Sequence, residues 1–108
     1  MSNVMLQHTC LKMTKEERFH YGRLAQLGCI ACRVLGYGFS PCEIHHLRTG
    51  VGAGQKADFR NAVGLCHRHH RTGGYGVAIH AGIRGFIKTV GMNETELLNE
   101  VNKLLEEL

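Results

Sequence analysis

The sequence predicts a small α+β domain in which a β-hairpin and a short helix are stapled by zinc and flanked by a helix at each end. Two observations predict this class. A CxxC pair and a CxxH pair stand on either side of short strand-like segments, and helix-capping signals mark a segment near each end. With 108 residues, 14 glycines and no Trp, the chain is expected to form one domain with a thin core, and such domains often need a bound metal.

The N-terminal part divides into a loose segment and a helix. Residues 1–13 show no hydrophobic period and are expected to be loose, whereas a single domain is predicted over residues 14–108. The segment TKEERFHYGRLAQLG predicts a helix that Thr14 caps, that Glu17 provides with a capping box and that Gly28 ends. The CIAC segment, residues 29–32, follows directly as a predicted zinc knuckle.

The middle of the chain breaks into short pieces. The segment YGFSPCEIHHL predicts a turn that feeds a strand, and AVGL predicts a second strand. The Gly-rich, basic segment RTGVGAGQKADFRN would connect them, and an ordered loop of this length is usually functional. A short helix is expected from CHRHHR to Gly73 and Gly74, which completes a strand–strand–helix motif over residues 41–74.

Two further helices are predicted toward the C-terminus. The segment VAIHAGIRGFIKTVG predicts a helix that Gly82 and Gly85 interrupt. Residues 94–108 predict the clearest helix, with Asn93 as its cap and Glu96 completing a capping box. Its apolar stripe predicts a core face or an oligomer contact, not a chemical site; the stripe comprises Leu97, Leu98, Val101, Leu104, Leu105 and Leu108.

Charge is unevenly distributed along the chain. Residues 1–92 hold 12 Lys/Arg and 4 Asp/Glu, a balance of +8, while residues 93–108 hold one Lys and five Glu, a balance of −4. A basic body suits a polyanion such as nucleic acid, although an ordinary solvated surface would show the same balance. No signal peptide or membrane span is expected, so a cytoplasmic location is predicted, in the host cell if a phage encodes the chain.

Four side chains predict a closed zinc site. Cys29 and Cys32 form the CxxC, and Cys66 and His69 form the CxxH across the predicted hairpin. Structural Zn²⁺ takes four tetrahedral nitrogen or sulfur ligands and leaves no open position. Buried apolar cysteines, a disulfide framework and a redox CxxC are the alternatives; reduced cytosolic thiols and the absence of a βαβ pattern count against the last two. Cys42 lies beside the histidine pair and is an alternative to one of the four ligands, but a packing role is favoured for it.

The remaining histidines predict a second site near the same hairpin. They are His45, His46 and His70, with Asn61 between the two groups and His80 beyond. Neutral imidazole binds transition metals, and free imidazole titrates near neutral pH and can act as a general base. Adjacent histidines therefore allow one ring on a metal and the other on a water molecule. Neighbours on a regular strand face opposite sides, so the strand is expected to end or bend at the pair.

These residues resemble a known family. The pattern CEIHHL … N … CHRHH resembles the His-Asn-His (HNH) endonuclease motif, which implies a treble-clef-like ββα-metal fold that holds one divalent ion. The wider framework LGCIACR … PCEIHHLRTG … LCHRHHR … GVAIHAG resembles the recombination enhancement function (Ref) proteins of phages. That branch implies a nuclease that cuts DNA where a RecA filament has paired a strand. The resemblance covers roughly residues 14–92.

The resemblance implies a role for each matching residue. His46, the second of its pair, matches the general base, and His45, the first, matches a metal ligand. Asn61 matches the Asn that pins the loop by backbone hydrogen bonds. His70 matches the ligand on the helix, and Glu43 matches a carboxylate that orients an imidazole.

The sequence departs from the family pattern in two places. Many HNH nucleases carry another histidine four residues after the helix ligand, where this chain has Gly74. His80, expected on a loop, is the substitute third ligand. The chain also has no long basic N-terminal extension of the kind associated with Ref. Any extra contact with DNA or a filament that such an extension would make is therefore not expected here.

The implied chemistry is phosphodiester hydrolysis by Mg²⁺ or another divalent ion in the second site. The reaction develops negative charge on phosphate oxygens, which a cation stabilises while an imidazole activates water. Basic side chains of the loop and helix are predicted to hold DNA phosphates; they are Arg48, Lys56, Arg60, Arg68 and Arg71. Each of these is alternatively a solvated surface residue.

Two functions from different classes are consistent with these residues. The first is a metal-dependent DNA endonuclease of recombination, with duplex or single-stranded DNA in a recombination intermediate as its substrate and a RecA filament as a partner. The second is a zinc-stapled nucleic-acid-binding module without catalysis, which would explain the charge, CxxC and CxxH but not the other histidines. The RecA filament follows from the resemblance alone.

Overall fold

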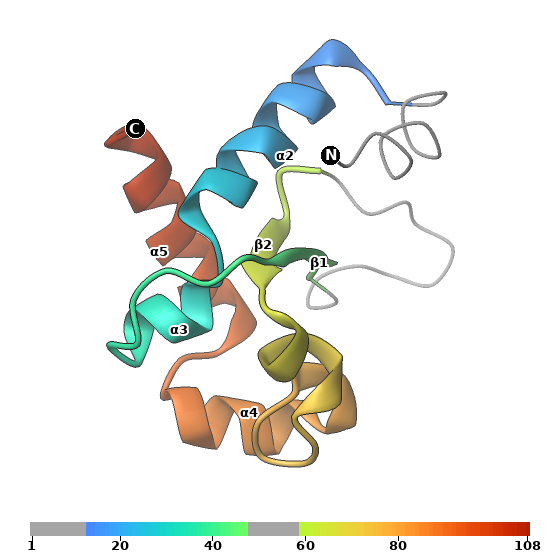
Figure 1. The fold of residues 1–108 in the computed structure, drawn as a ribbon, viewed down its shortest axis with the longest axis vertical. Helices are drawn as coiled ribbons and strands as arrows, with labels where there is room; N and C mark the ends of the chain where they lie inside the picture. The colour runs from blue at the N-terminus through green and yellow to red at the C-terminus, as the bar shows by residue number, and fades with distance from the viewer. Residues whose placement is uncertain (1–12, 48–58) are drawn as a thin grey trace.

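The computed structural model describes residues 13–47 and 59–108 of the chain. Its elements in chain order are α2 (Lys15–Leu27), α3 (Ile30–Val34), β1 (Glu43–His46), β2 (Ala62–Leu65), η1 (Arg68–Thr72), η2 (Ile79–Ala81), α4 (Ile83–Val90) and α5 (Glu94–Glu106). The predicted α+β class, a two-stranded hairpin with a short helix and flanking helices, is confirmed (Figure 1). None of the described helices is long and apolar enough to cross a membrane.

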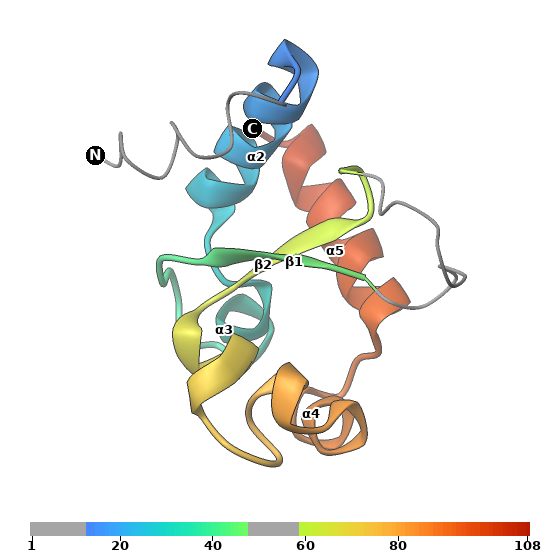
Figure 2. The ribbon, with the colours of Figure 1, turned by 90° about the vertical axis from the view of Figure 1, so that its right-hand side faces the viewer.

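The two strands form an antiparallel hairpin through the middle of the described fold (Figure 2). The register pairs His45 with Val63 and His46 with Ala62, and the amide of Leu47 continues the pairing by donating to the carbonyl of Asn61 at 2.9 Å. All four residues of β2 are buried, as expected of a short apolar strand covered on both faces. The hairpin therefore places β1 with its polar side chains beside a buried strand.

Helices α2 and α5 begin as the sequence predicts. Thr14 accepts a hydrogen bond from the amide of Glu17, whose side chain accepts one from the amide of Thr14. Asn93 and Glu96 make the same reciprocal pair at the start of α5. The two helices lie side by side in both views, and the Arg23 guanidinium of α2 donates to the carbonyl of Leu105 (Figures 1 and 2).

One apolar core lies between the hairpin and the helices. Its members come from α2, α3, β2, α4 and α5, and those that are almost completely buried are Leu24, Ile30, Val63, Leu65, Phe86, Leu97 and Val101. The apolar stripe of α5 supplies much of this core, because Leu97, Val101 and Leu105 are buried and Leu98 and Leu104 pack against them. Leu108 at the end of the stripe is 59% exposed. The core thus connects the C-terminal helix directly to the hairpin.

Three helical segments show detail beyond the prediction, and one of them differs from it. Cys29 caps a short helix, α3, so the predicted zinc knuckle CIAC lies at the start of a helix. The predicted helix over residues 77–91 is divided by Gly82 alone, because Gly85 lies inside α4 against Gly76 and Tyr75. The short helix η1 is a single wide turn, in which Gly73 donates to the carbonyl of Arg68 at 3.0 Å. Tertiary contacts override the local breaking tendency of Gly85.

Candidate functional site

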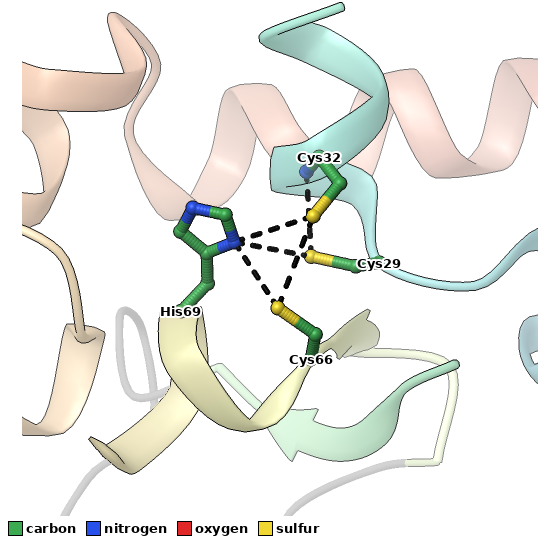
Figure 3. Close-up of side chains that lie close together, drawn as sticks. All are labelled: Cys29, Cys32, Cys66 and His69. Atoms are coloured by element: carbon green, nitrogen blue, oxygen red, sulfur yellow. Dashed lines mark hydrogen bonds between the residues drawn. The ribbon is translucent and has the colours of Figure 1, made fainter. Parts of the chain in front are cut away.

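The four residues of the predicted zinc site converge on one point (Figure 3). The Nδ1 atom of His69 lies 3.5 Å from the sulfur of Cys29, 3.5 Å from that of Cys32 and 3.3 Å from that of Cys66. The sulfurs of Cys32 and Cys66 are 3.8 Å apart. Segments on both sides of the hairpin in sequence therefore meet at these four residues, which we call the cysteine cluster.

The distances within the cysteine cluster fit a tetrahedral zinc ion. Zinc bonds of about 2.3 Å to sulfur and about 2.0 Å to nitrogen place two sulfurs about 3.8 Å apart and a sulfur about 3.5 Å from the nitrogen. Burial raises the pKa of the Cys29 thiol to about 12, so a cation is needed to hold this sulfur as a thiolate. The donor set and its geometry both fit Zn²⁺, which would close the site with four protein ligands.

Local backbone geometry shapes the Cys29 and Cys32 side of the cluster. The sulfur of Cys29 accepts a hydrogen bond from the amide of Cys32 at 3.3 Å, as an N-cap side chain does. The hydroxyl of Ser40 donates to the sulfur of Cys32 at 3.3 Å. Gly28 precedes the pair with φ of +75°, and a Cβ there would meet the carbonyl oxygen of Ser40 at 2.4 Å. The glycine lets the chain turn sharply into the site.

Cys42 lies outside the cysteine cluster, as the packing assignment predicts. Its thiol donates to the carbonyl of Leu24 at 3.6 Å, and its sulfur lies against Gly64 of β2. Burial raises the pKa of this thiol to about 11, which keeps it protonated at neutral pH. Cys42 is thus placed to pack between α2 and the hairpin.

A second group of possible metal ligands, which we call the histidine cluster, consists of His45, His70 and His80, the three residues expected there. They come from β1, η1 and η2 respectively, and one ligand atom from each lies within 4.8 Å of the others. The Nε2 atoms of His70 and His80 are 3.0 Å apart. Two nitrogens bound to one ion at about 2.1 Å and at right angles would also be about 3.0 Å apart. The three imidazoles therefore fit one divalent ion.

Two carboxylates orient imidazoles of the histidine cluster. The Nδ1–H of His70 donates to Glu43 at 2.7 Å, which leaves Nε2 of His70 to face His80. The Nε2–H of His45 donates to Glu94 at 2.9 Å, which leaves Nδ1 of His45 for an ion. Glu43 was expected to orient an imidazole. Glu94 was not anticipated, because nothing near it in the sequence indicates contact with a strand 49 residues earlier.

The protonation state of the cluster suits metal binding. Burial lowers the pKa of His45 below its ordinary value, and the hydrogen bond to Glu94 opposes that shift. His45 is therefore neutral at pH 7, as a metal ligand must be. The guanidinium of Arg71, with smaller contributions from His70 and His67, lowers the pKa of Glu43 to about 2, so Glu43 is ionised. Neutral imidazoles backed by carboxylates form a common metal-binding arrangement.

His46 lies apart from the histidine cluster. Its Nε2 atom is 3.0 Å from the hydroxyl of Tyr21 on α2, and the two rings meet edge to face. The strand was expected to end or bend at the histidine pair: β1 ends at His46, and the regular hairpin register through both residues shows no bend. Alternation along β1 instead sends the His45 and His46 side chains to opposite faces. Burial lowers the pKa of His46, so its ring is neutral at pH 7.

The residues predicted to bind DNA differ in their surroundings. Arg71 donates to both carboxylate oxygens of Glu43, at 3.2 Å and 2.6 Å, so its guanidinium is already engaged. Arg60 lies over the ring of Phe59, and Arg68 is exposed on η1. Arg48 and Lys56 lie outside the described residues, as does most of the loop that Asn61 was expected to pin. The structure therefore places only part of this predicted surface.

A family model described as recombination enhancement, RecA-dependent nuclease, matches residues 13–106. No curated protein and no solved structure matches the chain. The match includes every residue of the cysteine and histidine clusters, and it supports a nuclease role in recombination. The chain belongs to the recombination-enhancement family of RecA-dependent nucleases.

Proposed function

We propose that this protein is an HNH-type endonuclease that hydrolyses DNA phosphodiester bonds with a divalent ion in the histidine cluster and with His46 as general base. The observation that carries the proposal is the convergence of His45, His70 and His80 from three separate elements, with carboxylates fixing the tautomers of two of them. A purely structural domain already has its zinc staple in the cysteine cluster. A second cluster of three imidazoles has no comparable packing purpose.

The ion would supply Lewis-acid stabilisation of the negative charge that develops on the phosphate. Three imidazoles and no carboxylate among the direct donors suit a transition-metal ion better than Mg²⁺, which prefers oxygen ligands and keeps several waters. The three protein ligands leave positions for substrate, in contrast to the four ligands of the cysteine cluster. The two clusters therefore fit different ions and different purposes.

His46 is suited to accept the proton of the attacking water. Its ring is neutral at pH 7, because burial disfavours the charged form. In the tautomer whose Nε2–H donates to the hydroxyl oxygen of Tyr21, Nδ1 is the proton acceptor. His45 and His46 face opposite sides of β1, so a scissile phosphate would have to approach both faces of this strand to meet the ion and the base.

Exposed basic residues close to the hairpin support binding of the DNA backbone. Arg68 on η1 and Arg60 beside β2 lie on the two segments that flank the second strand. Contacts of this kind position a duplex or a single strand without reading its bases. A RecA filament on DNA is proposed as the setting, from the description of the family. The cytoplasmic location stays a proposal from the sequence alone.

The proposal is tested by cleavage of duplex DNA with and without RecA filaments and ATP, in Mn²⁺, Co²⁺ or Mg²⁺. We expect His46→Ala to lower the cleavage rate by about 10²-fold or more, the usual contribution of a general base. Tyr21→Phe should cause a smaller loss, because the base remains but its ring is less well held. Zinc content and melting temperature of each variant serve as controls for folding.

Two results would separate the alternatives. Normal cleavage by a folded His46→Ala protein would refute the general base. DNA binding by native protein without cleavage under any of these conditions would favour the non-catalytic zinc-stapled binding module. Cleavage at the same rate with and without RecA filaments would show that the filament is not required. It would leave the proposed HNH-type chemistry unchanged.

A further inference from the structure

The start of helix α5 reaches into the histidine cluster through Glu94. Glu94 is the first residue of the helix and is only 3% exposed, an unusual burial for a carboxylate. Its Oε2 atom is 2.9 Å from Nε2 of His45, and both side chains are almost completely removed from solvent. With Glu94 ionised, its carboxylate can only accept, and this hydrogen bond then carries a proton on Nε2 of His45.

We propose that Glu94 is a positioning residue for the second metal site: it holds His45 in the Nε2–H tautomer and directs Nδ1 to the ion. The inference rests on the proposed function, because it assumes that the histidine cluster binds metal. Carboxylates that hold the far nitrogen of a ligand histidine commonly change metal affinity about 10- to 100-fold when they are removed. Glu94 would act through His45 without touching the ion.

Comparison of Glu94 with Glu43 shows how the two carboxylates of the histidine cluster differ in their surroundings. Glu43 performs the equivalent task for His70, but it is shared with Arg71 and His67 at a partly exposed position. Glu94 and His45 are both buried, so water competes weakly for their hydrogen bond. The two carboxylates come from distant parts of the sequence, and together they set two of the three ligand tautomers.

A purely structural role for Glu94 is the alternative. A carboxylate at the first position of a helix interacts favourably with the helix dipole, and a hydrogen bond to β1 would help to dock α5. Such a role predicts lower stability in Glu94 variants, with no change in metal affinity. Metal affinity and the tautomer of His45 therefore distinguish the two roles.

The test titrates Co²⁺ alone into protein whose cysteine cluster is filled with Zn²⁺, and follows the visible absorption of the bound Co²⁺. We expect Glu94→Gln to weaken Co²⁺ binding about 10-fold and Glu94→Ala up to about 100-fold. The matched control is Glu96→Gln, which removes the same charge from the same turn, keeps the capping box and should bind Co²⁺ as the native protein does. Melting temperatures without Co²⁺ report any general loss of stability.

A second measurement needs no variant. Long-range ¹H–¹⁵N correlation spectra of the native protein report which nitrogen of His45 carries the proton. We expect Nε2–H in the protein with zinc in the cysteine cluster alone, and Nδ1 bound to metal after a second equivalent of Zn²⁺. A proton on Nδ1, or metal on Nε2, would overturn the inference even if the Glu94 variants did not fold.

The outcomes also separate this inference from the proposed function. If the native protein binds no Co²⁺ beyond its structural zinc, the metal site and the inference both fail. If native protein binds Co²⁺ and both Glu94 variants bind it equally well, only the positioning role of Glu94 fails.

Discussion

At the scale of single residues, backbone geometry separates the members of each histidine pair. In β1, alternation directs His45 to the histidine cluster and His46 to Tyr21. In the single turn η1, consecutive side chains point in different directions around the axis, so His69 joins the cysteines and His70 joins the second cluster. One short chain therefore places four histidines in three different environments.

Glycine at position 64 is required by close packing. A Cβ there would lie 2.5 Å from the sulfur of Cys42 and 2.8 Å from the carbonyl oxygen of Gly28, and the second contact is with backbone that cannot easily move. We expect Gly64→Ala to lower the free energy of unfolding by several kcal/mol, as overpacking of a buried site does. Chemical denaturation with zinc present measures this change.

The control for this substitution is Gly22→Ala. Gly22 lies on the exposed side of α2, and a Cβ there would meet nothing within 4 Å. Alanine should raise stability by about 0.5–1 kcal/mol at this helical position. Equal effects of the two substitutions would contradict the packing described for Gly64.

At the scale of elements, α5 combines two properties that its sequence shows separately. Its capping box and apolar stripe predict a stable amphipathic helix, and the structure confirms both. The fold then places the first turn of that helix beside β1, where Glu94 meets His45. The helix was assigned to the core or to an oligomer contact, but its first residue also belongs to the surroundings of the histidine cluster.

The two capping boxes offer a comparison between equivalent helix starts. Thr14→Ala and Asn93→Ala should each lower stability by about 1 kcal/mol, because each removes the acceptor for an amide at the helix N-terminus. Only Asn93→Ala should also weaken Co²⁺ binding at the histidine cluster, since fraying of α5 displaces Glu94. Calorimetry and Co²⁺ titration of both variants measure the two effects. Equal Co²⁺ affinities would show that the helix start and the cluster are independent.

At the scale of the whole molecule, the cysteine cluster joins segments from two parts of the fold. Cys29 and Cys32 belong to the start of α3, and Cys66 and His69 lie at the end of the hairpin and in η1. The strands are four residues each, and a hairpin of this size is marginal in water without further support. Zinc at this cluster would therefore supply folding free energy as well as a local link.

Removal of zinc should unfold the protein. We expect a strong chelator, or Cys29→Ser, to abolish the cooperative thermal transition seen by circular dichroism, with recovery of the chelated native protein on addition of Zn²⁺. Cys42→Ser is the matched control, because this thiol lies outside the cluster. It should keep one tightly bound zinc and a cooperative transition. A cooperative transition in zinc-free native protein would show that the fold does not depend on zinc at the cysteine cluster.

Much of the fold could be predicted because its signals are local. The caps at Thr14 and Asn93 involve partners three residues away, and the CxxC spacing brings two sulfurs to one side of a single turn. The roles of the histidines in the second cluster were implied by resemblance to a family motif. The interruption predicted at Gly85 was wrong, because packing against Gly76 favours a continuous helix there over the local preference of glycine.

The sequence by itself determined the α+β class, the starts of α2 and α5 and the four residues of the cysteine cluster, and it indicated a second group of histidines whose ligand set came from the family resemblance. Only the tertiary structure decided that Glu94 holds His45, that Tyr21 meets His46 and that Arg71 is engaged by Glu43. These pairs are separated by 49, 25 and 28 residues, so no local pattern indicates them. The first two pairs exist because the apolar faces of α2 and α5 are buried in the core beside the hairpin, and that burial fixes where Tyr21 and Glu94 lie. The third pair exists because η1 follows β2 directly and returns toward β1.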